Sequence, residues 1–157
     1  ALLYALAHRR LARAGFQHYE IANWARPTRR SLHNLMYWRN GEWVGVGAGA
    51  HSHLGGIRSH RPAALGAYLA EVAHGTPRRV DGESDERVDG AILGLRLAGG
   101  IDLARFAARF GDAARDRLAA DLATLEGRAL LRWSEGRVRL TPRGRILANE
   151  VFVQLVP

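Results

Sequence analysis

The stretch from Tyr19 to His53 constrains the fold of this chain most strongly, because it concentrates aromatic, imidazole and glycine residues. Within it lie three of the four tryptophans, two of the four tyrosines and three of the seven histidines. It also contains the glycine run Gly45-Val46-Gly47-Ala48-Gly49-Ala50. A core needs aromatic residues, but it rarely places them beside histidines, arginines and flexible glycines. The stretch is therefore expected to form a wall that faces a ligand.

Composition excludes several classes of site. The chain of 157 residues contains no cysteine, which excludes disulfides, a thiol nucleophile and cysteine-ligated metal centres within these residues. No apolar run approaches the roughly 20 residues of a membrane span, and no signal-peptide pattern opens the chain. Because the chain starts at Ala1 and its only methionine is Met36, we expect a fragment without its N-terminal part, although a processed chain would look the same.

Positive charge is concentrated in the first half of the chain. The net charge of +8 arises in residues 1–80, where eleven arginines accompany three carboxylates. Residues 81–157 carry twelve arginines and twelve carboxylates, and the chain has no lysine. The first half is therefore expected to attract anions such as phosphate, carboxylate or nucleic acid.

The first half predicts the last helix-to-strand step of an α/β unit. Apolar periodicity predicts a helix over residues 2–14, stopped by Gly15 and followed by a strand from Phe16 to Ile21. Ser31 is expected to cap a short helical turn that places His33 and Tyr37 on one face. The further expected elements are a turn at Asn40-Gly41, a strand over residues 42–46, a loop over 51–56 and a helix over 62–74.

The second half predicts a winged-helix-like module. Three helices are expected over residues 85–97, 103–110 and 112–126, the first capped by Ser84 and the second by Asp102. A β-hairpin over residues 130–140 and a last helix to about residue 155, begun by Thr141-Pro142, complete it.

A winged helix can bind DNA through one helix and its wing. This module is electrically neutral, however, and its third helix, counted over residues 113–126, carries three carboxylates against two arginines. Because phosphate contacts supply most non-specific affinity for DNA, nucleic acid is not an expected partner.

His33, Asn34, Tyr37 and Trp38 form the most specific local pattern, His-Asn-x-x-Tyr-Trp. An imidazole can ligate iron, and tyrosine and tryptophan can flank a flat aromatic ligand. The same pattern also fits a buried histidine that donates to a backbone carbonyl among packed aromatic residues. The residue chemistry alone leaves both interpretations open.

The glycine run, Glu20 and the pair His51 and His53 each have two interpretations. Glycines expose backbone N–H groups to a nucleotide or adenine, but they also permit a tight structural crossing, and G-x-G-x-G is not the dinucleotide fingerprint. Glu20 is either a functional strand-end acid or the partner of an arginine. The two histidines have metal-ligand character, but without a third ligand they support a metal site only weakly.

Two long motifs resemble the HemW-type radical S-adenosylmethionine proteins, which are haem chaperones related to oxygen-independent coproporphyrinogen III oxidase. These motifs are YEIANWARP over residues 19–27 and SLHNLMYWRNGEWVGVGAGAHS over residues 31–52. The family patterns are YEISN, HNxxYW and GxGxGAH, from which Ala22 and Ala48 depart mildly. Residues 93–103 and 140–145 also resemble the family's C-terminal domain.

The resemblance implies a fold and a set of ligands. Residues 1–56 would be the tail of a partial β/α radical-SAM barrel, residues 57–81 a connecting segment with a helix, and residues 82–157 a mostly α winged-helix-like domain. Haem would bind at His33, Asn34 and Tyr37, with His33 the candidate ligand of the haem iron. The adenine of S-adenosylmethionine would lie near Gly45, Gly47, Gly49 and Ala50.

The resemblance also implies a function. The intact protein would hold a [4Fe–4S] cluster on an upstream CxxxCxxC loop, so this chain alone is expected to be inactive. We expect a cytoplasmic chaperone that binds haem and delivers it to haem proteins, including membrane-associated ones. The alternative is an oxygen-independent coproporphyrinogen III oxidase, which decarboxylates its porphyrinogen oxidatively to protoporphyrinogen IX. The HNxxY pattern favours the chaperone.

Overall fold

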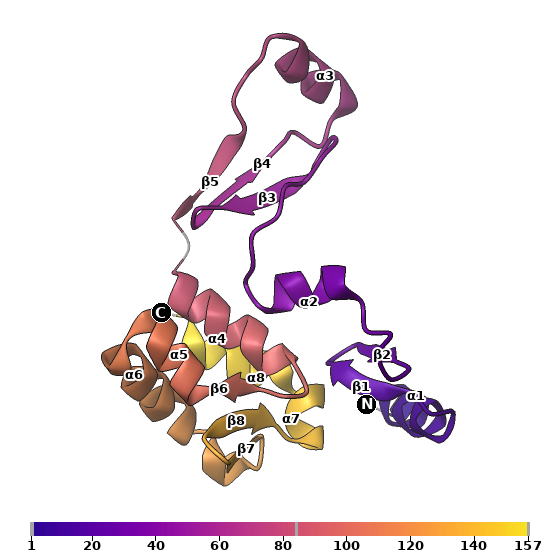
Figure 1. Ribbon diagram of the computed structural model, residues 1–157, viewed down its shortest axis with the longest axis vertical. Helices are drawn as coiled ribbons and strands as arrows, with labels where there is room; N and C mark the ends of the chain where they lie inside the picture. Colours follow the sequence, from indigo (N-terminus) through magenta and orange to yellow (C-terminus); the bar gives the residue numbers. More distant parts are fainter. Residues whose placement is uncertain (1, 84, 157) are drawn as a thin grey trace. The chain divides into compact units, whose positions relative to one another are not determined.

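The computed structural model describes residues 2–83 and 85–156 and shows a mixed α/β fold (Figure 1). The chain forms two compact units: unit one comprises Ala1–Arg39 and Arg87–Pro157, and unit two comprises Asn40–Glu86. These limits differ from the domain boundaries expected after residues 56 and 81. Within the described residues, no helix combines the length and apolar character that a membrane span requires.

Unit one begins with a helix and a strand, as the sequence predicts, but the strand belongs to a hairpin. Helix α1 (Leu2–Arg13) is followed within two residues by Gly15, which has a positive φ of 81°. Strand β1 (Gln17–Glu20) follows and pairs antiparallel with β2 (Asn23–Ala25), a short strand that the sequence analysis missed. The Tyr4 hydroxyl joins α1 to the hairpin by donating to the carbonyl of Ile21 at 2.8 Å.

Helix α2 (Leu32–Trp38) completes the N-terminal part of unit one. It starts where expected, because the Ser31 hydroxyl accepts a hydrogen bond from the Asn34 backbone N–H at 3.2 Å. Leu35 is the buried residue of this helix and packs with Tyr19 and Ala25 in a small core cluster. The remaining face of α2 is thereby left for other contacts.

The rest of unit one confirms the winged-helix-like module. Helices α4 (Glu86–Arg96), α5 (Leu103–Phe110) and α6 (Asp112–Ala123) pack with a three-stranded sheet of order β6-β8-β7. The core includes Leu95, Leu122, Leu130, Val138 and Val151, all almost completely buried. The strands are β6 (Ile101–Asp102), β7 (Leu131–Ser134) and β8 (Arg137–Leu140), of which β6 was not predicted.

Local capping chemistry fixes two of the helix starts in this module. The Asp102 carboxylate accepts from the backbone N–H of Arg105 at 3.0 Å, and Thr141 Oγ1 accepts from that of Gly144 at 2.9 Å. The expected cap Ser84 lies outside the described residues. The prediction of a single last helix is wrong, because Leu147, with ψ 28°, is not helical and interrupts it. In its place are α7 (Pro142–Ile146), α8 (Ala148–Phe152) and the 3-10 turn Val153–Leu155. Another 3-10 turn, Glu126–Arg128, follows α6.

Unit two is a three-stranded antiparallel sheet with one helix (Figure 1). The strands, in the order β3-β4-β5, are β3 (His51–Leu54), β4 (Ile57–His60) and β5 (Arg79–Glu83). Helix α3 (Leu65–Ala73) connects β4 to β5 and begins three residues later than predicted, after the extended residue Ala64.

Two further expectations for unit two are corrected. The segment 51–56, predicted as loop, is strand β3 and the turn Gly55-Gly56, whose φ values are 56° and 76°. The strand expected over residues 42–46 is reduced to a single bridge between Trp43 and His53. The first error arises because the polar sequence His-Ser-His-Leu lacks the β-branched residues that usually mark strands, so its pairing was missed.

Candidate functional site

Helix α2 brings His33 and Tyr37 together on one exposed face, as their spacing of four residues predicts. The Tyr37 hydroxyl lies 3.0 Å from His33 Nε2, and the two rings are nearly perpendicular, with centroids 4.8 Å apart. His33 is exposed rather than buried, and its ring partner is a tyrosine rather than a backbone carbonyl. The interpretation of His33 as a buried core histidine is therefore wrong.

The opposite side of α2 is fixed to the body of unit one. Leu35 is buried, Asn34 is half-buried, and the guanidinium of Arg96 stacks 4.4 Å above the ring of Trp38. Arg96 comes from the last turn of α4. These contacts hold α2 so that His33 and Tyr37 face outward on a supported helix.

Glu20 is completely buried and acts as a connector within unit one. Its Oε1 accepts from Arg96 Nε at 2.9 Å and lies 2.7 Å from Arg96 Nη2, while Oε2 accepts from Asn23 Nδ2 at 2.7 Å. The backbone N–H of Ala22 donates to the same Oε2 at 2.9 Å. Of the two interpretations of Glu20, the structure thus supports pairing with an arginine, and it identifies that arginine as one 76 residues away.

Arg96 also lines a cleft of about 360 Å³ in unit one. A second guanidinium, that of Arg145, lies in the same lining. Arg96 is paired with Glu20, however, and Glu150 also lines the cleft, so the lining carries charges of both signs and indicates no preference for an anion. The remaining lining residues are Ile21, Ile146, Leu147, Ala148, Asn149, Glu150 and Phe152.

His18 lies in a group of aromatic side chains in unit one whose role is structural. His18 Nε2 lies 3.3 Å from the Tyr4 hydroxyl and 3.1 Å from the Ile21 carbonyl oxygen, and its ring packs on Trp24. Burial lowers the pKa of His18 and raises the pKa of Tyr4, so both groups favour their neutral forms. Neutral, mutually bonded side chains of this kind join α1 to the β1–β2 hairpin.

The glycine run lies in unit two, where the chain's own atoms occupy several of its polar groups. Gly45 N donates to Ser52 Oγ at 2.9 Å, Gly49 N to the Pro62 carbonyl at 2.9 Å, and Ala50 N to the Gly47 carbonyl at 3.3 Å. These bonds support the interpretation of the run as a structural crossing.

Two glycines of the run differ in their surroundings. A Cβ on Gly45 would lie 2.0 Å from the His51 carbonyl oxygen, so this position tolerates no side chain. A Cβ on Gly47, whose φ is 107°, would meet no atom within 4 Å, so there is open space beside this residue. Gly47 is thus the member of the run with most room for a ligand.

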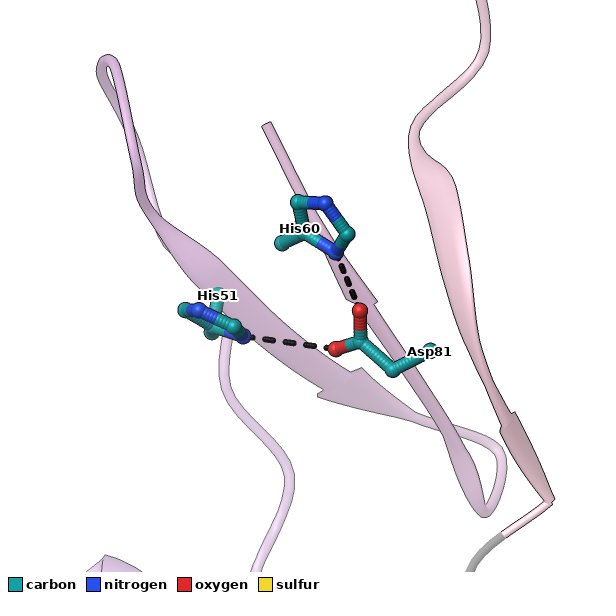
Figure 2. A group of neighbouring side chains, drawn as sticks. All are labelled: His51, His60 and Asp81. Atoms are coloured by element: carbon teal, nitrogen blue, oxygen red, sulfur yellow. Dashed lines mark hydrogen bonds and ion pairs between the residues drawn. The ribbon is translucent and has the colours of Figure 1, made fainter. Parts of the chain in front are cut away.

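His51 belongs to a cluster that sequence reasoning did not find (Figure 2). Its Nδ1 lies 3.3 Å from Asp81 Oδ2, and His60 Nδ1 contacts Asp81 Oδ1. The hydrogen bond from His60 is the main cause of the lowered pKa of Asp81. His53, considered beside His51 in the sequence, is buried instead, with Nδ1 3.0 Å from the Gly41 carbonyl oxygen.

Comparison with known proteins finds relatives of both parts of the chain. Residues 88–147 match the HemN C-terminal domain. The chain is 35% identical over 156 residues to Heme chaperone HemW of Bacillus subtilis (strain 168), and 39% identical over 158 residues to Heme chaperone HemW of Mycobacterium tuberculosis (strain CDC 1551 / Oshkosh). Over nearly its whole length the chain is thus similar to the HemW proteins. These alignments cover 97% and 98% of the chain but only 41% and 38% of the relatives, so it spans about two fifths of their length.

The fold agrees with that of a solved relative. Coproporphyrinogen III oxidase (HemN) from Escherichia coli, a radical SAM enzyme, superimposes with a TM-score of 0.74 at 18% sequence identity. The superposition covers 96% of the chain and 39% of HemN. At this identity the likeness concerns the fold, and it confirms the expected class: an α/β part followed by a winged-helix-like domain.

Proposed function

We propose that the protein binds haem at the exposed His33–Tyr37 pair of α2 and delivers it to haem proteins. The observation that carries the proposal is the 3.0 Å contact between His33 Nε2 and the Tyr37 hydroxyl on a helix anchored by its other side. An imidazole can ligate haem iron, and a hydrogen bond at one ring nitrogen, here Nε2, orients the ring so that the other nitrogen, Nδ1, can bind the metal. The identity to two relatives named Heme chaperone HemW favours the same function.

The surroundings of His33 leave its imidazole open to a ligand. His33 is solvent-accessible, so iron can approach it without unfolding the helix. Asn34 lies beside His33 and adds an amide within the same turn. When bound, haem would supply an iron centre for His33, while Tyr37 restricts rotation of the imidazole and so reduces the entropy lost on ligation.

S-adenosylmethionine and a [4Fe–4S] cluster are further groups that the similarity to HemW and HemN suggests for the whole protein. The chain contains no cysteine, so it supplies no thiolate ligand to such a cluster. Near Gly45–Ala50, three N–H groups are bonded within the chain, whereas Gly47 has space beside it. We therefore assign the adenine contact of S-adenosylmethionine to the backbone around Gly47.

Haem-accepting proteins in the cytoplasm, some of them membrane-associated, are the proposed partners. Coproporphyrinogen III oxidation is the competing activity, and it has weaker support because the oxidase HemN is related at only 18% identity. Anaerobic turnover of coproporphyrinogen III by the cluster-loaded whole protein separates the two. Formation of protoporphyrinogen IX would assign the oxidase activity, and its absence together with stoichiometric haem binding would assign the chaperone.

Haem titration tests the role of His33. We expect the wild-type chain to give a Soret band at one haem per chain, and His33→Ala to weaken haem affinity by about tenfold or more, as loss of a metal contact does. Tyr37→Phe removes only the hydroxyl, so it should retain the ligand and show a smaller loss.

His74→Ala is the matched control for this titration. His74 is an exposed histidine whose Nδ1 is bonded to the Ala70 carbonyl oxygen of its own helix at 2.7 Å. It should leave the Soret band and the affinity unchanged. A His33→Ala spectrum and affinity equal to those of the wild type would contradict the proposed ligand.

A further inference from the structure

Three side chains from three adjacent strands of unit two converge on one exposed face (Figure 2). His51 on β3 lies directly opposite His60 on β4, and Asp81 comes from β5, which pairs with the other edge of β4. One ring nitrogen from each histidine and one carboxylate oxygen all lie within 4.8 Å of one another. These residues are remote in sequence and meet only because of the register of the sheet.

A local irregularity of β5 contributes to this convergence. Ser59 is opposite Val80 and Ile57 is opposite Glu83, so Asp81 and Gly82 together occupy the place opposite one residue of β4. Gly82 has φ 103°, a conformation that favours glycine. A bulge of this kind redirects a side chain out of the regular ladder, and such bulges are frequent beside functional sites.

The arrangement has the dimensions of a metal site. With bonds of about 2.0–2.1 Å to nitrogen and oxygen, ligand atoms around a tetrahedral zinc ion lie about 3.3 Å apart. His51 Nδ1 and Asp81 Oδ2 are already 3.3 Å apart, and small side-chain rotations would bring the longest separation, at most 4.8 Å, into range.

Charge around the cluster favours a cation. Unit two contains four arginines and six carboxylates, a net charge of −2 with histidine neutral, whereas the whole chain carries +8. Arg79, which lies opposite His60 in the sheet, is directed to Glu71, with Nη2 2.7 Å from Oε1. Within residues 2–83 and 85–156, the Asp81 carboxylate contacts the two histidines and no guanidinium.

We propose that His51, His60 and Asp81 bind one divalent transition-metal ion of the zinc class. Two imidazoles and one carboxylate are ligands that zinc accepts, and they leave a fourth tetrahedral position for water or a small ligand. Because the three ligands come from three strands, the ion joins β5 to the β3–β4 hairpin. The three residues belong to unit two, whereas the proposed haem ligand His33 belongs to unit one.

Zinc titration of the haem-free, cluster-free 157-residue chain, followed by isothermal titration calorimetry, tests the proposal. We expect one zinc ion per chain, and we expect His60→Ala and Asp81→Asn to weaken binding by about tenfold or more. His51→Ala, at an exposed position, gives the same loss with least risk to folding. Circular dichroism of each variant without metal verifies that the fold is intact.

Two histidine variants outside the cluster are the controls. His74→Ala, in the same unit, and His33→Ala, in the other, should bind zinc as the wild type does. Co²⁺ gives a second readout, since a four-coordinate site produces visible d–d absorption that His51→Ala should abolish. Absence of zinc binding to the wild type, or equal binding by wild type, His51→Ala and Asp81→Asn, would overturn the proposal. Neither outcome of the zinc experiment bears on the proposal that His33 binds haem.

Discussion

Replacement of Glu20 by alanine is expected to lower the free energy of unfolding by about 3 kcal/mol, because it breaks a buried ion pair by removing one partner. The carboxylate binds Arg96 through Oε1, at 2.7 Å and 2.9 Å from two guanidinium nitrogens. Its Oε2 accepts from Asn23 and from the backbone N–H of Ala22. Alanine would leave all of these donors without their acceptor. Because Arg96 also stacks on Trp38, the loss should loosen α2 as well.

Urea denaturation of the wild type and variants measures this loss. Glu20→Gln keeps the shape and one oxygen acceptor, so it should cost less than alanine. Glu150→Ala removes the same side chain from an exposed pair with Arg128, for which a loss within about 1 kcal/mol is expected. Equal losses for Glu20→Ala and Glu150→Ala would show that Glu20 does not connect the elements as described.

Gly45→Ala should destabilise unit two by about 3 kcal/mol, near the upper end of what overpacking costs. The new Cβ would lie 2.0 Å from the carbonyl oxygen of His51 and 2.9 Å from its carbon. Both are backbone atoms at the start of β3, so they cannot move aside as the end of a flexible side chain could. The crossing would have to open, at the expense of the bond from Gly45 N to Ser52 Oγ.

Thermal denaturation, with hydrogen exchange to locate the change, measures the effect of Gly45→Ala. Gly66→Ala is the matched control in the same unit, because its added Cβ meets no atom within 4 Å. Gly66 lies in α3, where alanine should stabilise by up to about 1 kcal/mol. If Gly45→Ala were as stable as the wild type, the glycine would not be required by a structural crossing.

Features determined by neighbouring residues could be predicted from the sequence. Ser31, Asp102 and Thr141 cap helices through bonds that span three residues, so each is recognisable from its local pattern. The shared face of His33 and Tyr37 follows from helical spacing in the same way. Whether that face is exposed depends on what packs against α2, which local spacing does not contain.

Features determined by distant pairing could not be predicted in this way. Arg96 is 76 residues from Glu20, and the twelve arginines of the second half gave no reason to choose it. The histidine pair was assigned to His51 and His53, because adjacency in sequence is visible. Residues i and i+2 of a strand are about 6.6 Å apart, whereas cross-strand partners are about 5 Å apart. The register that pairs His51 with His60 therefore decides the cluster.

Ligation of the haem iron by His33 is the central claim, and resonance Raman spectroscopy of the ferrous haem complex tests it most directly. An iron–histidine stretching band should be present in the wild type and should shift when histidine is labelled with ¹⁵N. Tyr37→Phe and His74→Ala should retain the band, and His33→Ala should lose it. A band that persists in His33→Ala, or that is absent from the wild-type complex, would contradict ligation of the iron by His33.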